Sequence, residues 1–322
     1  MVKVPKGYRS KNVRDSRNVG GSSSSGRSFG GSRRLSGGGG TRAQGQRGGC
    51  GIGFIIMLAV VAFLVFSCVG GGGTASDSPV GSTNDTASGG DDLSADVDTG
   101  GAASNSESQQ EEDTFTLINF VLDDLQNEYW PDEFAEAGLV YEDALINVFE
   151  DGVTTNGCGS ATSAVGPFYC PADNTAYIDI EFLFILQDQL GAEGDFTQAY
   201  IIAHEIGHHV QNLLGTIDLL RQAQSGVSTV ESNALEVMSE LQADCFAGAW
   251  ARSFSDRGFL DEGDLEEGVN AASAVGDDAI TGSTNQENFT HGSSAQRVEW
   301  FNTGFNEGTD SCTTFDGALT PR

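Results

Sequence analysis

The sequence predicts an α+β domain over residues 113–322, mainly helical with a small β-sheet and preceded by a single transmembrane helix. Three observations predict this class. Apolar residues recur at helical spacing near the start of this region and through its second half, whereas two short apolar stretches between them are strand-like. The length of the region suits one ordinary domain. The residues before it differ in composition, which separates a tail, a span and a linker from the domain.

The domain is expected to begin with a helix that Pro131 ends. Residues 144–149 and 175–180 are the two strand candidates, and a glycine-rich stretch with two cysteines lies between them. From Phe196 onward the patterns are mainly helical. The apolar positions that predict the first helix are Phe115, Ile118, Val121, Leu122 and Leu125.

Charge divides the chain near residue 51. Eleven of the 16 Lys and Arg residues precede this point and 45 of the 46 Asp and Glu residues follow it, so the net charge of −30 combines a basic head with an acidic body. Residues 1–50 are rich in Gly, Ser and Arg and by themselves cannot bury enough apolar surface to become ordered. We therefore expect a disordered basic cytoplasmic tail that is attracted to anionic lipid head groups. No aromatic platform is interleaved with these charges, so nucleic acid is not an expected partner.

Residues 51–70 are an apolar stretch of 20 residues without charge or proline. At 1.5 Å per residue, one helix of this length spans a hydrocarbon core of about 30 Å. Because basic residues flank only its N-terminal side, the N-terminus is predicted to be cytoplasmic and residues 71–322 to lie outside. A cleaved signal peptide fits less well because its charged head is normally short, although residues 65–68 loosely resemble a lipoprotein cleavage box that would lipidate Cys68. Residues 71–112 are expected to be a flexible acidic linker.

Four cysteines follow the apolar stretch, an even number that favours disulfides in an extracytoplasmic domain. Three pairings are possible. We favour Cys158 with Cys170, which closes a short loop, and Cys245 with Cys312, which ties the C-terminal tail to a helix. A zinc site formed by all four thiolates is the alternative, but the spacings suit it poorly.

A metal-binding motif stands in the middle of the domain, where His204, Glu205 and His208 occupy an apolar helical stretch. Two histidines four residues apart project from the same face of a helix and can bind one Zn²⁺. The glutamate directly after the first histidine can reach a metal-bound water and accept its proton. His209 lies about 100° round the helix from His208 and is not an expected ligand.

A catalytic zinc needs a third protein ligand, and the spacing to the next residues excludes an HExxHxxGxxH arrangement, because Leu214 stands where its last histidine would be. The other common solution is a glutamate on a later helix. Glu240 and Asp244 share one helical face there, where Glu240 could bind the metal and Asp244 could accept the N–H of a ligand histidine. An ordinary solvated acidic face is the alternative interpretation in so acidic a chain. Glu231 and Glu236 are competing candidates for the third ligand.

His291 is the remaining histidine of the chain. A histidine near the metal could donate to the carbonyl oxygen on which negative charge develops during acyl transfer. Tyr200 is a second candidate for this role. A histidine at a helix start or on the surface is the alternative interpretation of His291.

Four stretches of this sequence resemble the bacterial neutral zinc metallopeptidase family: residues 166–173 (GPFYCPAD), 194–215 (GDFTQAYIIAHEIGHHVQNLLG), 240–248 (ELQADCFAG) and 291–297 (HGSSAQR). The resemblance covers residues 114–315, and members typically have a basic head, one membrane span and this domain outside.

The resemblance implies a zincin-like, gluzincin-type peptidase in the bacterial cell membrane, with Zn²⁺ as its cofactor and a peptide or protein as its substrate. His204, His208 and Glu240 would be the ligands, Glu205 the base and Asp244 the partner of a ligand histidine. Residues 168–170 would form a strand beside the substrate. The chain departs from the family in its acidity, which suggests a saline environment or cationic substrates.

The predicted function is peptide-bond hydrolysis by a membrane-anchored zinc enzyme in which Glu205 is the general base. One alternative is a zinc-binding extracytoplasmic interaction module without turnover, against which the intact Glu205 argues. A surface structural protein is the other, but it gives no reason for the histidine motif.

Overall fold

The computed structural model describes residues 1–17 and 100–319 except for 193 and 316, and for residues 100–107 and 188–190 it describes the backbone only. In chain order the strands are β1 (Val13–Asp15), β2 (Leu145–Phe149), β3 (Gly152–Thr154), β4 (Ser160–Thr162), β5 (Phe168–Cys170) and β6 (Thr175–Asp179). The α-helices are α2 (Gly100–Asp124), α3 (Trp130–Glu136), α4 (Ile180–Leu190), α5 (Asp195–Leu213), α6 (Thr216–Gln224), α7 (Thr229–Asp256), α8 (Asp264–Ala274), α9 (Asp277–Thr281) and α10 (Ser294–Glu307). A π-helix, η2 (Leu125–Tyr129), joins α2 to α3, and the short 3₁₀-helices are η3 (Ser163–Val165), η4 (Gln286–Asn288) and η5 (Thr309–Ser311).

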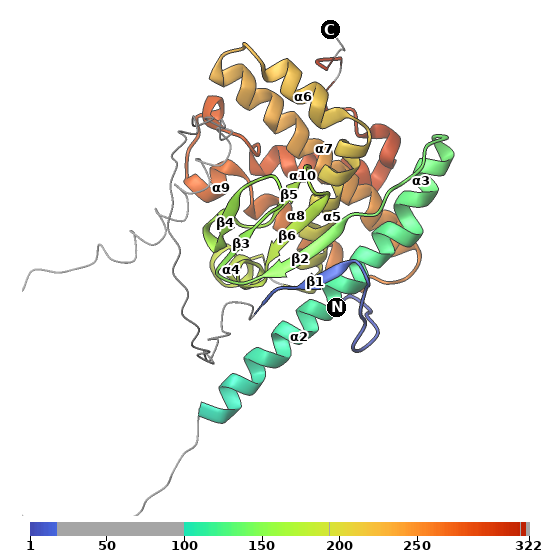
Figure 1. Cartoon of the computed structure of the whole chain (residues 1–322), viewed down its shortest axis with the longest axis vertical. Helices are drawn as coiled ribbons and strands as arrows, with labels where there is room; N and C mark the ends of the chain where they lie inside the picture. The colour runs from blue at the N-terminus through green and yellow to red at the C-terminus, as the bar shows by residue number, and fades with distance from the viewer. Residues whose placement is uncertain (18–99, 193, 316, 320–322) are drawn as a thin grey trace, which may run out of the picture.

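The main sheet of the described residues has four strands in the order β1-β2-β6-β5, and β3 and β4 form a separate hairpin (Figure 1). β2 is parallel to β1 and to β6, whereas β5 is antiparallel to β6. Every residue of β6 is buried, as expected for a strand covered on both faces. The prediction of an α+β domain, mainly helical with a small sheet, is confirmed.

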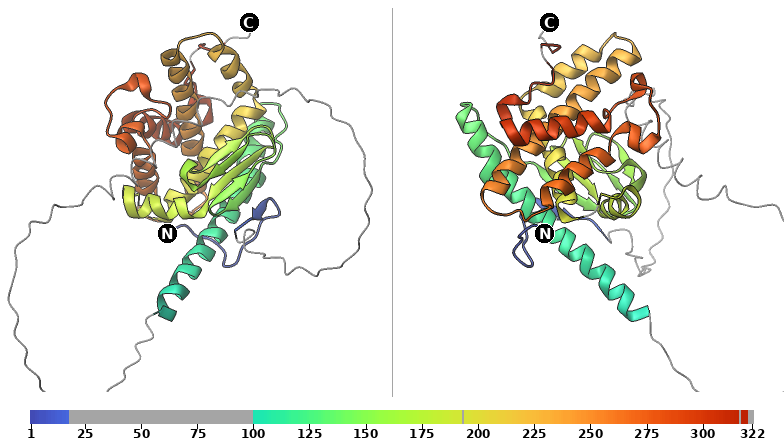
Figure 2. Two further views of the ribbon diagram at one scale, coloured as in Figure 1. Left: turned by 60° about the vertical axis from the view of Figure 1, so that its left-hand side comes forward. Right: turned by 180° about the vertical axis from the view of Figure 1, so that it is seen from behind.

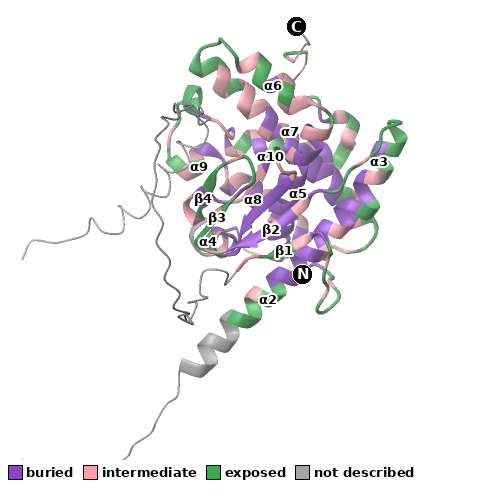
Figure 3. Ribbon diagram, viewed as in Figure 1, coloured by how far each residue is buried: buried purple, intermediate pink, exposed green. Residues whose placement is uncertain are grey.

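Helix α5 lies at the centre of the domain, where it contacts β5 and β6 on one side and α7 and α8 on the other (Figure 2). Most of its residues are buried along its whole length (Figure 3). Phe196 near its start stacks on Trp250 of α7 with ring centroids 6.0 Å apart. Because the sheet encloses α5 on one side and helices α7 and α8 enclose it on the other, a polar side chain on α5 needs a hydrogen-bond partner or a function.

The first helical run is longer than the sequence predicts. Pro131 does not end it, because the chain continues through η2 into α3, where Pro131 stands in the first turn. Pro131 has no N–H to donate, and it stands where the π-helical bonding of η2 ends and α3 begins. The run also begins earlier, since α2 starts at Gly100, inside the predicted linker of residues 71–112.

The disulfides that the sequence favours are present: Cys158 is bonded to Cys170 and Cys245 to Cys312. The first joins the β3–β4 hairpin to β5, and the second joins α7 to the segment after η5. The alternative zinc site of four thiolates is therefore wrong.

Residues 1–17 correct a second expectation, because they pack on the domain instead of forming part of a disordered tail. They include β1, which pairs with β2, and Val2, whose exposed fraction is 5%. The segment has little apolar surface to bury within itself, and the surface of the domain supplies the contacts that order it. In the described parts of the chain no helix combines the length and apolar character needed to cross a membrane. The predicted span, residues 51–70, lies outside the described residues.

Candidate metal centre

Helix α5 places His204 and His208 one turn apart, with their ring centroids 4.8 Å from each other. The four-residue spacing that defines the motif puts both imidazoles on one face. His204 has an exposed fraction of 6%, so the pair lies in a largely desolvated position.

Helix α7 brings Glu240 to the same point. Its Oε2 lies 3.2 Å from Nε2 of His204, and its Oε1 lies 3.4 Å from Nε2 of His208. The close approach of the two helices depends on Gly207, because a Cβ there would lie 3.0 Å from the Cα of Ala243. The glycine between the two histidines therefore positions the carboxylate of the facing helix.

The donor spacing of these three residues fits zinc. One donor atom from each of the three residues lies within 4.8 Å of the others, and the two oxygens of Glu240 lie 3.2 and 3.4 Å from the imidazole nitrogens of His204 and His208. Ligand atoms 2.0–2.2 Å from a tetrahedral Zn²⁺ are about 3.3–3.6 Å apart, so these side chains can surround such an ion. Two imidazole nitrogens and one carboxylate form the His₂Glu set of catalytic zinc sites, which leaves one position open.

The electrostatics of this position favour a cation. Burial lowers the pKa of His208, but Glu240 outweighs burial and raises the pKa to about 10. A carboxylate that stabilises an imidazolium so strongly also stabilises a metal ion in the same place, which would bind in competition with the proton.

Asp244 lies one turn after Glu240, and its Oδ1 accepts a hydrogen bond from Nδ1 of His204 at 2.9 Å. With Nδ1 engaged by Asp244, Nε2 is the ring nitrogen of His204 that faces Glu240, at 3.2 Å, and it could bind a metal ion in place of a proton. Although burial raises the pKa of Asp244, the charges of Arg297 and His204 outweigh it and hold the pKa below its usual value. The geometry is the one predicted for Asp244.

Arg297 of α10 is a functional candidate to which the sequence analysis gave no role. Its Nε donates to Oδ2 of Asp244 at 2.8 Å and its Nη2 to Oδ1 at 2.9 Å. Tyr200 also donates its hydroxyl to Asp244, at 2.5 Å. The Tyr200 proton is committed to this carboxylate, which removes Tyr200 as the second candidate for stabilising a substrate oxyanion.

Gln211 is the corresponding partner of His208, and sequence reasoning missed it as well. Nδ1 of His208 donates to Oε1 of Gln211 at 2.9 Å. Gln211 is fully buried, and Ser239 holds it in place through two hydrogen bonds. The hydroxyl of Ser239 donates to Oε1 of Gln211 at 3.0 Å, and Nε2 of Gln211 donates to the backbone carbonyl of Ser239 at 2.7 Å. The three-residue spacing from His208 on one helix was the available signal.

Glu205 projects from the same helix with an exposed fraction of 6%, and its Oε2 has no hydrogen-bond partner among the described residues. Burial raises the pKa of this carboxyl, and the neighbouring His208 and His204 lower it in part. A buried carboxylate oxygen without a partner is costly in a folded protein. Its free lone pairs suit a group that accepts a proton from a ligand.

His291 stands between α9 and α10 and donates from Nδ1 to Oδ1 of Asp277 at 3.1 Å. The same carboxylate accepts the backbone N–H of Thr290 at 2.7 Å and of His291 at 2.8 Å. Burial lowers the pKa of His291, but Asp277 outweighs this and raises it. The contact with Asp277 leaves Nε2 of His291 as the ring nitrogen available to a ligand.

The competing ligand candidates are not part of the three-residue group, although Glu236 is close enough to Glu240 and His208 for their charges to shift its pKa. Glu231 caps the start of α7 through Ser228, and Glu236 accepts a hydrogen bond from Gln224 at 2.7 Å. His209 is buried and donates from Nε2 to the carbonyl of Glu142 at 2.7 Å, so it does not face the other two histidines. Of the described residues, Asp195, Asp264 and Glu267 form a second group close enough for a metal, but these carboxylates accept backbone N–H groups.

A helix with two histidines and a glutamate, completed by a glutamate from a later helix, defines the class of zinc-peptidase-like proteins. Residues 4–315 match the family model described as "Putative neutral zinc metallopeptidase", and the chain belongs to this family.

Two relatives illustrate the similarity. The chain is 47% identical to "Uncharacterized protein YpfJ" of Escherichia coli K12 over 195 residues, which are 59% of this chain and 68% of the relative. It is 46% identical to an uncharacterized protein of Mycobacterium tuberculosis over 183 residues, 52% of this chain and 61% of the relative. No solved structure gives a significant match.

Proposed function

We propose that the protein is a zinc-dependent metallopeptidase with a zincin-like active site on helices α5 and α7. The single observation that carries the proposal is the buried Oε2 of Glu205, which has no hydrogen-bond partner in the described part of the chain and lies on the helix that bears His204 and His208. A purely structural metal site is closed and has no use for such a group, whereas hydrolysis needs a base there.

His204, His208 and Glu240 would hold the zinc ion. When bound, zinc supplies a Lewis acid that lowers the pKa of water and polarises a carbonyl group. Asp244 and Gln211 keep each histidine in the tautomer whose Nε2 is free to bind, through their contacts of 2.9 Å with the two Nδ1 atoms.

Glu205 accepts a proton from the attacking water and passes it to the leaving nitrogen of the peptide bond. His291 donates from Nε2 to the substrate carbonyl oxygen as negative charge develops there. Asp277, which fixes Nδ1 of His291 at 3.1 Å, holds the ring in the tautomer that can donate.

An extended peptide would lie along β5, the last strand in the order β1-β2-β6-β5, which also contacts α5. Addition of a strand to the edge of a sheet supplies main-chain hydrogen bonds without demanding a particular sequence. The high net negative charge of −30 favours cationic peptides among such substrates.

We further propose that the domain acts outside the cytoplasm. The bonds between Cys158 and Cys170 and between Cys245 and Cys312 support this, because disulfides persist mainly in oxidising compartments. A membrane anchor at residues 51–70 stays a prediction from hydropathy.

The function is tested by incubating the full chain with a diverse peptide library and reading cleavage by mass spectrometry. Wild type should cleave, and Glu205→Gln should lose on the order of 10²–10⁴ in rate while it retains the same zinc content. Glu299→Gln, an exposed position on α10, is the matched control and should behave as wild type. Equal cleavage by Glu205→Gln and wild type would contradict the role of the base. A zinc-loaded wild type without cleavage would favour an interaction module.

A further inference from the structure

Residues 2–17 occupy a continuous surface formed by the edge of β2, one face of α2, the start of α5 and the loop between α7 and α8. Figure 1 shows β1 beside β2 and next to α2. The family model matches the chain from residue 4, so it includes most of this segment. This surface and its occupant lie apart from the metal centre and do not depend on the proposed activity.

The strand contact extends the sheet. Val13 stands opposite Ile146 and Asp15 opposite Val148 in a parallel register. The N–H of Ile146 donates to the carbonyl of Asn12 at 2.9 Å, and the N–H of Ser16 donates to the carbonyl of Val148 at 2.8 Å. These bonds satisfy the N–H of Ile146 and the carbonyl of Val148, which would have no strand partner on this side of β2 if β1 were absent.

Side chains of α2 hold the residues before β1. Oδ1 of Asn119 accepts the N–H of Ser10 at 2.8 Å, and Asn119 has an exposed fraction of 1%. Asp123 accepts the Ser10 hydroxyl at 2.6 Å and the Tyr8 hydroxyl at 2.9 Å. A buried amide such as Asn119 requires a fixed partner, and this partner comes from the N-terminal segment.

The first residues of the segment reach the start of α5 and the loop that follows α7. The N–H of Val2 donates at 2.7 Å to Oδ2 of Asp195, the first residue of α5, and the Val2 side chain is buried in the main core. The N–H of Lys3 donates to the carbonyl of Phe259 at 3.1 Å. The contacts thus extend from one end of the segment to the other and combine apolar burial with specific hydrogen bonds.

We propose that residues 2–17 are an integral part of the metallopeptidase domain and lie in the same compartment as its metal centre. Strands that share hydrogen bonds cannot stand on opposite sides of a bilayer about 30 Å thick. A single crossing by residues 51–70 would separate β1 from β2, because the crossing stands between them in the chain. Residues 17 and 100 therefore lie on the same side of the membrane, contrary to the prediction that the N-terminus and the domain lie on opposite sides.

Hydrogen exchange on the purified full chain tests the docking. The amides of Val2, Ser10 and Ser16, which donate to Asp195, Asn119 and Val148, should exchange at least about 10²-fold more slowly than unprotected amides. Exchange of these amides at the unprotected rate, while β2 and β6 stay protected, would overturn the proposal.

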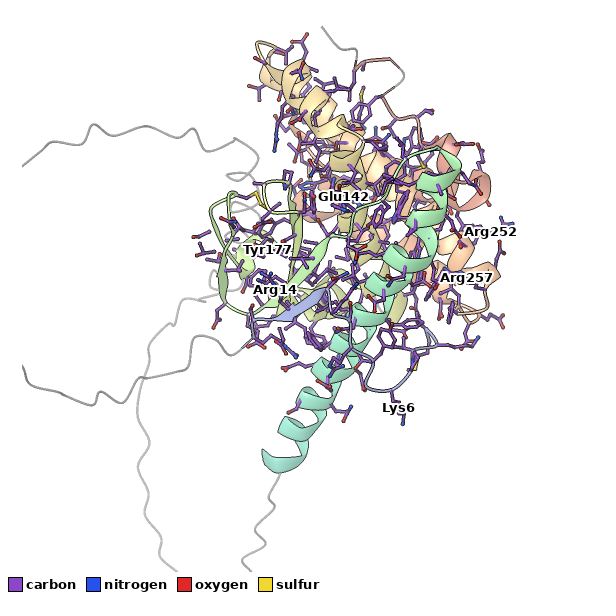
Figure 4. All side chains as sticks on the ribbon, turned by 45° about the vertical axis from the view of Figure 1, so that its right-hand side comes forward. Lys6, Arg14, Glu142, Tyr177, Arg252 and Arg257 are labelled. Atoms are coloured by element: carbon purple, nitrogen blue, oxygen red, sulfur yellow. A yellow bond between two sulfur atoms is a disulfide. The ribbon has the colours of Figure 1, made fainter. Side chains whose placement is uncertain are left out.

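Cysteine labelling in intact bacterial cells tests the compartment. With Cys50→Ser and Cys68→Ser as background, Lys6→Cys reports on the segment and Val140→Cys on the domain, since the other cysteines form disulfides. Lys6 lies at the tip of the N-terminal loop (Figure 4), and Val140 is 84% exposed. Both sites should react equally with a membrane-impermeant maleimide, before and after permeabilisation. Labelling of Val140→Cys alone in intact cells, or of Lys6→Cys alone, would overturn the proposal.

Discussion

Replacing Arg297 by Met should destabilise the domain strongly, because it removes the cation from a buried ion pair. The side chains of Arg297 and Asp244 have exposed fractions of 4% and 0%, and two hydrogen bonds of 2.8 and 2.9 Å join them. Methionine fills a similar volume but leaves the Asp244 carboxylate without its main counter-charge. Breaking a buried pair in this way costs about 3–5 kcal/mol of unfolding free energy.

Thermal unfolding of the metal-free full chain is the appropriate assay. For a domain of this size, each kcal/mol lowers the midpoint by roughly 2–4 °C, so Arg297→Met should unfold about 6–20 °C below wild type. Arg252→Met is the matched control, since the Arg252–Asp256 pair is exposed (50% and 64%) and contributes about 0.5 kcal/mol or less. Equal midpoints for Arg297→Met and Arg252→Met would refute the reasoning.

A double variant separates lost charge from lost packing. Asp244→Leu combined with Arg297→Met removes both charges and leaves no unpaired carboxylate in the core. The combined loss should be smaller than the sum of the two single losses, because paired charges replaced by apolar groups are close to neutral in stability. Additive losses would show that the two side chains do not act as a pair.

Three further substitutions test the metal centre. Glu240→Ala should lose its zinc on dialysis. The control Glu231→Ala, which alters only the exposed start of α7, should keep about one zinc per chain. Zinc retained by Glu240→Ala would refute the ligand assignment. Gln211→Ala should weaken zinc binding by about 10–100-fold in a competition titration with a chelator, since it frees Nδ1 of a ligand histidine; unchanged affinity would show that the contact does not orient the ring. Gly207→Ala should lower the unfolding free energy by about 1–3 kcal/mol, because its Cβ would meet the backbone of the facing helix; urea unfolding measures this, and an unchanged midpoint would contradict the close approach.

The sequence predicts those parts of the site whose residues share a helix. His204 and His208 lie four residues apart, as do Glu240 and Asp244, and this spacing alone places each pair on one helical face. Helical spacing made Glu240 one of three candidates for the third ligand, and the family resemblance favoured it over Glu231 and Glu236, because no local pattern alone brings one of these carboxylates to the histidines. Cysteine number and spacing likewise predicted the disulfides that the structure contains.

Other features left no local signal. Arg297 reaches Asp244 from α10, and only the scarcity of basic residues in the acidic body could have marked it as a buried partner. β1 pairs with β2 across more than one hundred residues of chain, and a strand of three residues is too short to show an alternating pattern. The head was judged by its own composition, whereas its order depends on a surface that distant residues build.

The central claim is that α5 and α7 together bind one zinc ion through His204, His208 and Glu240. Crystals of the zinc-loaded protein, measured at the zinc absorption edge, test this most directly. The account predicts an anomalous peak about 2.0–2.2 Å from Nε2 of each histidine and from the Glu240 carboxylate, with a fourth position open. A peak at Asp195, Asp264 and Glu267 instead, with none at the histidines, would contradict it.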